Sequence, residues 1–257
     1  PVLWTRQDID EALGGGQWFG EPGQDWQATG VTYQKTHMRP GDLVFTTDPV
    51  HWRKKYLDTN LDLQWYFKKG AAAIIAGNAG AAAGAPGPVL VVDNTYEALI
   101  RLGSYARDRF RGRVICITGS VGKTTTKEMA RSLLAHVAPT VGSRQNFNQL
   151  SGLAMSMAHT HPDIRYGIYE FSADTPWKTL PKAQMMRPHI AVITAIEADH
   201  LSLYKDLDGV ARQKSLLIDG MEKDGTLILN RDSQFYQFFY EKALSLGITS
   251  IISFGRH

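Results

Sequence analysis

The stretch ITGSVGKTTTKEMA, residues 117–130, combines an apolar strand, a glycine-containing turn, a Lys-Thr pair and the start of a helix. Gly119 and Gly122 allow the backbone of the turn to wrap closely around a phosphate with its N–H groups pointing inward. The helix N-terminus adds a partial positive charge, Lys123 adds a full one, and Thr124 is suited to bind Mg²⁺. A chance Gly/Lys/Thr turn is the alternative, but the strand–turn–helix context favours a nucleotide-binding loop.

The usual phosphate-loop pattern G-x-x-x-x-G-K-[ST] has its first glycine where this chain has Ile117. The sequence therefore predicts a shortened variant, T-G-S-x-G-K-T. The residues that we expect to contact the nucleotide in this loop are Gly119, Ser120, Gly122, Lys123, Thr124 and Thr125.

Strand and helix patterns alternate on the C-terminal side of the loop. Apolar strands interleaved with amphipathic helices are typical of a parallel sheet with helices on both faces. The predicted strands are VICIT (114–118), YGIYEF (166–171), AVITAI (191–196), TLILN (226–230) and ITSIISF (248–254). The predicted helices cover residues 123–137, 150–159, 208–220 and 234–246.

The first half of the chain predicts a small mixed α/β unit. Thr5 is a candidate cap for the helix RQDIDEAL, which the three glycines from Gly14 would end. Strands are expected over 28–34, 41–47, 71–77 and 89–93, helices over 61–69 and 94–109, and a Gly/Ala/Pro-rich surface loop over 77–88. We therefore expect an α/β protein with an N-terminal substrate domain, residues 1–110, and a P-loop ATPase domain with a mostly parallel sheet, residues 111–257.

Composition excludes several classes of protein. Hydrophobic residues make up 43% and charged residues 21% of 257, as in an ordinary globular domain. The net charge of +3, with no basic block longer than Arg53–Lys55, argues against a nucleic-acid partner. The single cysteine, Cys116, excludes an internal disulfide framework and a cysteine metal cluster. Neither a membrane-spanning run nor a signal-peptide pattern is visible, so we expect a cytoplasmic protein with no membrane partner.

Three further residues carry possible chemistry. Glu170 ends a predicted strand, on the side of the sheet where α/β proteins bind ligands, and beside a P-loop it is a candidate Mg²⁺ ligand rather than a plain surface residue. His200 follows the predicted strand AVITAI, a place that favours metal binding over a structural role. Lys214 lies in a pattern of helical spacing, so on composition alone it is a solvated lysine.

Together these motifs resemble the Mur ligase family, the ATP-dependent amide-forming enzymes of cell-wall precursor synthesis. TGSVGKTTTKEM resembles the P-loop of the family, and TVGSRQNFNQLSG resembles the asparagine-containing segment that follows it. YEFSAD supplies the acidic residue after a strand, and ITAIEADHL supplies the family histidine. ARQKSLLIDGM places Lys214 fourteen residues after His200, as in the family, and TLILNRD matches the family Asn-x-Asp.

The resemblance implies a reaction and its cofactors, ATP and Mg²⁺. The carboxylate of a small-molecule acid takes the γ-phosphoryl group of ATP, and the amine of an amino acid or peptide then attacks the acyl phosphate. The implied catalytic residues are Lys123, His200 and Lys214, the last modified by CO₂ to a carbamate. The implied metal ligands are Thr124, Glu170, His200 and Lys214, and the implied nucleotide contacts beyond the P-loop are Asn146, Asn148, Asn230 and Asp232, which could otherwise be turn residues.

The chain also departs from the family pattern. Tyr33, Gln34 and Lys35 stand where the family has an Asp-Ser/Thr-Arg triplet that contacts a uridine nucleotide, so we expect weak binding of UDP-muramoyl peptides. The family also has a C-terminal domain that brings the amine, and we expect that domain of the same polypeptide to be missing here. A P-loop small-molecule kinase and a non-catalytic nucleotide- or metabolite-binding module remain the alternatives.

Overall fold

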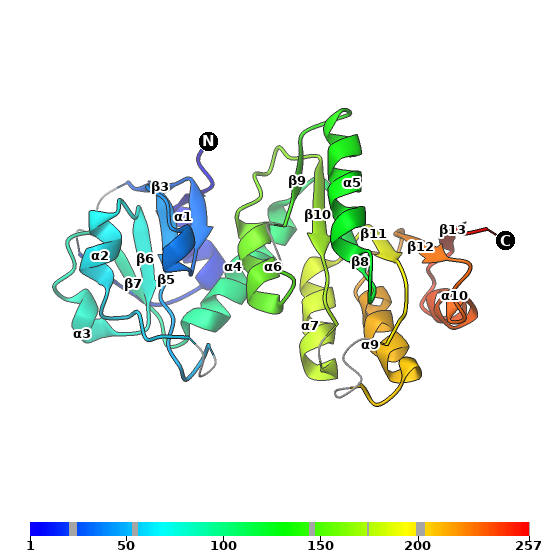
Figure 1. Ribbon diagram of the computed structural model, residues 1–257. Coiled ribbons are helices and arrows are strands. Elements are labelled where there is room, and N and C mark those ends of the chain that lie inside the picture. The colour runs from blue at the N-terminus through cyan, green and yellow to red at the C-terminus, as the bar shows by residue number, and fades with distance from the viewer. Residues whose placement is uncertain (21–24, 53–55, 144–146, 174, 199–203, 257) are drawn as a thin grey trace. The chain divides into compact units, whose positions relative to one another are not determined.

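The computed structural model describes residues 1–257 apart from 21–24, 53–55, 144–146, 174, 199–203 and 257 (Figure 1). The chain divides into two compact units. The first comprises Pro1–Asp108 and Ala154–His161, and the second comprises Arg109–Leu153 and Pro162–His257. Residues from the middle of the chain thus belong to the first unit, where the indole of Trp4 donates a hydrogen bond to the carbonyl of Ala158 at 2.8 Å.

The first unit contains a sheet with the strand order β2–β7–β6–β5–β4. Neighbouring strands from β4 to β7 are parallel, whereas β2 is antiparallel to β7. The strands are β2 (Gln17–Phe19), β4 (Gly30–Thr32), β5 (Asp42–Phe45), β6 (Ala73–Ala76) and β7 (Val89–Val91), with a separate antiparallel pair, β1 (Trp4–Thr5) and β3 (Gln27–Ala28). The edge strand β2 and the separate pair β1 and β3 are only two or three residues long, which is too short for an alternating sequence pattern.

The helices of the first unit are α1 (Arg6–Leu13), the 3₁₀ turn η1 (Lys35–His37), α2 (Leu63–Lys68), α3 (Ala79–Ala82) and α4 (Thr95–Arg109). Helix α1 begins at a capping box formed by Thr5 and Asp8 and ends at Gly14, whose φ is +64°. The expected loop over 77–88 was wrong in part, because Asn78 accepts a hydrogen bond from the Ala81 N–H and caps the short helix α3.

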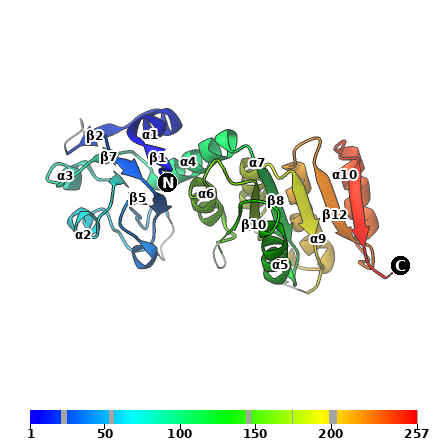
Figure 2. The same cartoon turned by 90° about the horizontal axis from the view of Figure 1, so that it is seen from above.

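The second unit is built on one parallel sheet in the order β13–β12–β11–β8–β10–β9 (Figure 2). Its strands are β8 (Arg113–Thr118), β9 (Thr140–Gly142), β10 (Tyr166–Glu170), β11 (Ile190–Ile193), β12 (Thr226–Asn230) and β13 (Ser250–Phe254). Its helices are α5 (Lys123–Ala135), α6 (Leu150–Ala158, shared with the first unit), α7 (Pro176–Met186), α9 (Leu207–Asp219) and α10 (Tyr236–Ser245). The expected α/β class with a parallel sheet is confirmed.

Helix α7 has no counterpart among the predicted elements. Its sequence carries a proline inside the helix, Pro181, and that residue normally signals a helix end. The helix ends at Arg187, which takes a left-handed conformation with φ +37°.

Apolar side chains from β8, β10 and β11 form the core beneath α5. Ile115, Ile117, Ile168 and Val192 are its buried members, and Ala130 and Leu134 of α5 pack against them. Cys116 is buried on the opposite face of the same strand, where a thiol behaves as a small apolar group. Among the described helices, none is long and apolar enough to cross a membrane.

Candidate functional site

The loop between β8 and α5 wraps tightly because its two glycines have positive φ angles. Gly119 has φ +149° and Gly122 has φ +87°, values that L side chains rarely adopt. A Cβ atom at Gly119 would also collide with the hydroxyl group of Thr194. That hydroxyl donates to the carbonyl of Val121 at 2.6 Å and so holds the loop against the end of β11. Position 119 therefore accepts only glycine.

Ser120 ties the loop to the segment that follows β11. Its backbone N–H donates to the carbonyl of Ala195 at 2.7 Å. Its hydroxyl donates to the carbonyl of Glu197 and accepts from the N–H of the same residue, both at 3.0 Å. These bonds fix the loop before any ligand binds, so binding costs little further ordering.

Lys123 opens helix α5 and folds back over the loop. Its Nζ atom donates to the carbonyls of Gly119 at 2.8 Å and Ser120 at 2.9 Å. The cap of α5 is Gly122, which has no side chain to occupy the first N–H groups of the helix. Those N–H groups, the helix dipole and the ammonium group together favour an anion such as a phosphate.

Glu170 ends β10 beside Ile117 of β8, and its carboxylate joins two other segments. The hydroxyl of Thr124 on α5 donates to its Oε2 at 2.6 Å, and the side-chain amide of Asn148 donates to its Oε1 at 3.1 Å. The backbone N–H of Glu170 donates to the hydroxyl of Ser143 at 3.1 Å. Glu170 is only 3% exposed, so its charge lies in a place where a cation gains most from it.

The pair Thr124 and Glu170 fits a Mg²⁺ ion by its chemistry. Mg²⁺ prefers hard oxygen ligands, usually one or two carboxylates together with phosphate oxygens and water. A hydroxyl and a carboxylate in hydrogen-bond contact, one turn from a phosphate-binding loop, provide such a set. The described residues hold no cluster of three His, Cys, Asp or Glu side chains, and His200 lies outside them.

Lys214 lies in α9 and reaches the same loop. Its side chain is buried, and its Nζ atom donates to the carbonyl of Gly119 at 2.9 Å. The composition-based alternative, a solvated lysine on a helix surface, is therefore wrong. Two lysines from different helices, Lys123 and Lys214, share one carbonyl acceptor of the loop.

A cavity of about 340 Å³ lies beyond the ends of β11 and β12. It is lined by Ala195, Ile196, Glu197, Leu207, Asn230, Asp232, Ser233 and Gln234. Two of these, Ala195 and Glu197, are the residues that Ser120 binds, so the cavity adjoins the P-loop. Within the turn, Asn230 Oδ1 accepts from the N–H of Asp232 at 3.0 Å, and the Asp232 carboxylate accepts from the N–H of Arg256.

The expected site residues thus meet only in part. Most of the P-loop set, together with Asn148, Glu170 and Lys214, converges through the contacts described above. Thr125 is exposed on α5. Asn146 and His200 fall outside the described residues.

Lys182 of α7 belongs to the site although no sequence pattern indicated it. Its side chain is 1% exposed, and its Nζ atom donates to the carbonyls of Ser172 and Asn148 and to the hydroxyl of Ser172. It also lies 4.8 Å from the centre of the Phe171 ring. Helix α7, which carries Lys182, was also not predicted from the sequence.

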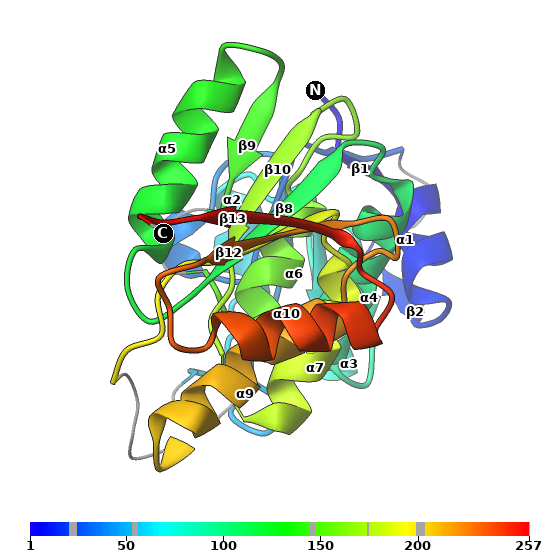
Figure 3. The same cartoon turned by 90° about the vertical axis from the view of Figure 1, so that its right-hand side faces the viewer.

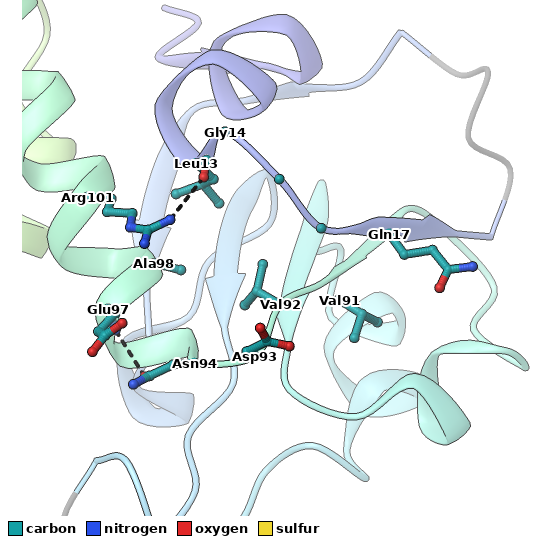
Figure 4. Close-up of a pocket in the computed structure, with 12 residues that line it drawn as sticks. Leu13, Gly14, Gln17, Val91, Val92, Asp93, Asn94, Glu97, Ala98 and Arg101 are labelled. Carbon is teal, nitrogen blue, oxygen red and sulfur yellow. Dashed lines mark hydrogen bonds between the residues drawn. The ribbon is translucent and has the colours of Figure 1, made fainter.

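The first unit holds a separate open pocket of about 500 Å³ (Figure 4). It lies between the loop of three glycines from Gly14 and the connection from β7 to α4. Asp93, Glu97 and Arg101 give it mixed charge, and Arg101 donates to the carbonyl of Leu13 at 3.3 Å. The glycines bring backbone, rather than side chains, to its rim.

Comparison with known proteins matches the second unit to one family. The sequence model of the Mur ligase middle domain matches residues 117–257. The UDP-N-acetylmuramoyl-tripeptide–D-alanyl-D-alanine ligase of Rickettsia prowazekii is 28% identical over 254 residues, which are 99% of this chain and 54% of the relative. The enzyme of the same name from Escherichia coli is 30% identical over 146 residues, 57% of this chain and 32% of the relative.

Solved structures agree with the sequence comparison. The MurF crystal structure from Acinetobacter baumannii has a TM-score of 0.80 at 27% identity and covers 98% of this chain and 53% of its own. The MurF ligase of Thermotoga maritima, solved in complex with ADP, shares the fold with a TM-score of 0.72 at 21% identity over 88% of this chain and 50% of its own. This chain spans about half the length of the Rickettsia relative. With the middle-domain match covering more than half of its residues, the chain belongs to the Mur ligase family.

Proposed function

We propose that this chain is the substrate- and nucleotide-binding part of an ATP-dependent carboxylate–amine ligase of cell-wall precursor synthesis. The reaction activates a substrate carboxylate as an acyl phosphate, which the amine of an amino acid or peptide then attacks. The observation that carries the proposal is the contact of Thr124 with Glu170 at 2.6 Å, directly beside the glycine loop. The phosphate-binding loop and a metal-suited carboxylate thus belong to one network.

The residues of the chain have separate tasks in this proposal. Lys123 and the N–H groups at the start of α5 bind the β- and γ-phosphates, and Lys123 gives up its carbonyl contacts to do so. Thr124 and Glu170 hold Mg²⁺, which when bound offsets the repulsion between an anionic carboxylate and the triphosphate. Asn148 orients the Glu170 carboxylate through its amide. The cavity with Asn230 and Asp232 takes the nucleoside.

Lys214 and His200 complete the metal site in the proposal. Lys214, converted to a carbamate, would exchange its role as a donor to Gly119 for that of an anionic ligand. Asn146 and Thr125 are assigned to the nucleotide by the family resemblance alone.

The proposed class of substrates, a peptide acid and a peptide amine, follows the names of the relatives. Those names give UDP-N-acetylmuramoyl tripeptide as the acid and D-alanyl-D-alanine as the amine. The amine is proposed to bind to the part of the full-length protein outside this sequence, since the relatives are about twice as long. Because the reaction consumes ATP, we propose that it takes place in the cytoplasm.

Positional isotope exchange in ATP tests the activation step. With the protein expressed from the complete coding sequence, ¹⁸O in the β,γ-bridge of ATP should scramble only when the acid is present, because acyl-phosphate formation is reversible. The acids to test are UDP-N-acetylmuramoyl tripeptide and the same peptide without its nucleotide. Glu170→Gln should abolish scrambling, whereas Glu128→Gln, on the exposed surface of α5, should not.

Other outcomes would redirect the proposal. ADP formed with an alcohol alone would assign the chain to a small-molecule kinase. ATP binding without exchange at saturating acid would make it a binding module. Scrambling that persists in Glu170→Gln would remove Glu170 from the metal site.

A further inference from the structure

The order of strands in the second unit puts most helices on one face of the sheet. Helix α5 links β8 to β9 by moving in one direction along the sheet, and each later connection, from β9 to β13, moves in the other direction. Parallel connections are nearly always right-handed, so a reversal of direction moves the helix to the opposite face. Figure 3 shows this result, with α5 on one side of the sheet and α7, α9 and α10 on the other.

The α5 face is therefore covered only over part of its width. Helix α5 packs over β8, β9 and β10, and no helix among the described residues covers β11 to β13 on that face. Parallel sheets are almost always covered on both faces. The uncovered strands are thus the part of the sheet that departs from this rule.

Exposure along these strands agrees with the topology. Val192, Ile228 and Ile252 are direct neighbours in the register of β11, β12 and β13, and their side chains point to the α5 face. Exposure rises along that row, from 8% at Val192 through a half-buried Ile228 to 54% at Ile252. On the other face of β12, Leu227 and Leu229 are buried beneath the helices.

Helix α5 presents further exposed apolar side chains beside the row formed by Val192, Ile228 and Ile252. Met129 and Leu133 of the helix, and Val137 just after its end, recur at every fourth position and are all exposed, Leu133 by 67%. Met129 and Leu133 lie on the side of the helix away from Arg131, whose aliphatic carbons lie close to Gly142 of β9. The exposed stripe of α5 therefore faces away from β9, toward the side of the sheet that carries β11 to β13.

We propose that an amphipathic helix from the part of the full-length protein outside this sequence covers this apolar surface. The surface consists of the α5 face of β11 to β13 and the exposed apolar side chains of α5. The size fits, because three strands at about 4.8 Å spacing are about as wide as one helix with its side chains. The occupant is a segment of the same protein because the relatives are about twice the length of this chain. Its apolar side contacts Ile228, Ile252 and Leu133, and its polar side faces water.

Thiol labelling tests this proposal independently of catalysis. Ile252→Cys and, separately, Leu133→Cys are made in the 257-residue chain and in the protein expressed from the complete coding sequence. The native Cys116 is fully buried and gives a low background. Each engineered thiol should react with a maleimide at least about 10-fold more slowly in the complete protein, since a covered thiol reacts only after local opening. Phe238→Cys on α10, at the opposite face, is the matched control and should react equally in both proteins.

Two results would overturn the proposal. Equal labelling rates at Ile252→Cys and at Leu133→Cys in the two proteins would show that no segment covers the surface. Slow labelling in the short chain that becomes faster on dilution would instead assign the surface to a second copy of this chain. Melting temperatures of all variants establish that each compared protein is folded.

Discussion

The ammonium group of Lys182 donates hydrogen bonds to oxygen atoms of Asn148 and Ser172, two residues in the segments beside Glu170. These acceptors include the carbonyl of Asn148 and both the carbonyl and the hydroxyl of Ser172. The hydroxyl of Ser172 donates in turn to the carbonyl of Asn148 at 2.9 Å, and the amide of Asn148 donates to Glu170. Lys182 is thus a positioning residue, which acts on the metal-suited carboxylate through Asn148.

The substitution Lys182→Met should distinguish a role in positioning Glu170 from a contribution to folding stability alone. Leaving buried carbonyls without their donor should lower the free energy of unfolding by about 1–3 kcal/mol, measured by urea denaturation. If Lys182 positions Glu170, the variant should also need more Mg²⁺ for half-maximal ADP binding in calorimetry, while ADP binding without Mg²⁺ stays unchanged. Lys178→Met on the same helix is the control. An equal loss of ADP affinity with and without Mg²⁺ would reduce Lys182 to a structural residue.

Lys214 should carry a carbamate in the active full-length protein. Carbamate formation needs the neutral amine, whereas a lysine in water has a pKa of about 10.4 and is charged near neutral pH. A buried site disfavours the charged ammonium form and therefore helps the reaction. Lys214 is buried against the P-loop carbonyl of Gly119, where a carbamate would join the proposed Mg²⁺ site. We expect a carbamate signal in ¹³C spectra after addition of labelled bicarbonate, and activity that falls in CO₂-depleted buffer and returns with bicarbonate.

Lys214→Ala should lose both the carbamate signal and phosphoryl transfer. It should keep most of its affinity for ATP, because the glycine loop and Lys123 remain. Activity indifferent to bicarbonate, together with a normal rate for Lys214→Ala, would contradict the assignment.

Residues of the site differ in how far the sequence could predict them. Gly119, Lys123 and Thr124 were predictable because a phosphate-binding turn needs small residues, a cation and a hydroxyl at fixed spacing. Glu170 was predictable from its place at the end of an apolar strand. Lys182 was not, because its role depends on which carbonyls the fold brings near it, and no local pattern records that.

At the scale of single elements, helix α2 carries a buried polar group, the side-chain hydroxyl of Tyr66. The hydroxyl of Tyr66 is buried and has no hydrogen-bond partner of good geometry among the described residues. Burial raises the pKa of this hydroxyl, and the nearby Thr59 offsets part of the rise. A buried hydroxyl without a partner destabilises the folded chain.

Tyr66→Phe should therefore raise the free energy of unfolding by about 1 kcal/mol in urea denaturation near neutral pH. The sign of the pH dependence follows from the raised pKa. The unfolded chain ionises near its ordinary pKa of 10.0 while the folded chain does not, so the parent loses stability as the pH rises through and above 10. The variant should lose less over the same range. Tyr240→Phe, half-exposed on α10, should change neither value, and a destabilised Tyr66→Phe would mean that the hydroxyl has a partner.

Most long elements were predictable because their sequences repeat the helical or strand period. The strands β8, β10 and β12 and the helices α4, α5 and α9 lie within a few residues of the expected ranges. The elements that were missed are either very short, such as β1 and β3, or carry a contrary local signal, such as Pro181 in α7. In α7 packing outweighs the penalty of the proline, since Ala183 and Met186 of this helix are fully buried.

At the scale of the whole molecule, the first unit raises the question of which acid is bound. Tyr33 follows β4 and is buried against Trp52, with ring centres 4.7 Å apart. Lys35 forms an ion pair with Asp62 at 2.6 Å and lies over the ring of Trp65. The chain therefore offers an aromatic cluster and an engaged lysine where the family resemblance expects a bidentate arginine.

Calorimetry of this chain with UDP-N-acetylmuramoyl tripeptide should accordingly give a Kd above about 100 μM. This value corresponds to a binding free energy smaller in magnitude than about 5.5 kcal/mol. Lys35→Arg, which restores a fork of donors, should strengthen binding if the uridine nucleotide lies nearby. Micromolar binding by the unaltered chain would show that the aromatic cluster itself accepts the nucleotide.

Ligation as a whole should need more than these 257 residues. The proposed network binds a nucleotide and activates a carboxylate, but the proposal places the amine outside this sequence, because the relatives are about twice as long. An acyl phosphate without a positioned amine loses an effective molarity that can reach about 10⁵–10⁸ M, so water competes for it. Mass spectrometry should therefore detect ADP and phosphate, but no amide, when this chain is incubated with ATP, acid and D-alanyl-D-alanine. The protein from the complete coding sequence, assayed in parallel, should form the amide and lose that product in Glu170→Gln. Amide formed by the 257-residue chain at a rate typical of enzymes would place the amine site within the two units described here, and the mixed-charge pocket beside Asp93 and Arg101 would then be the first place to look for it.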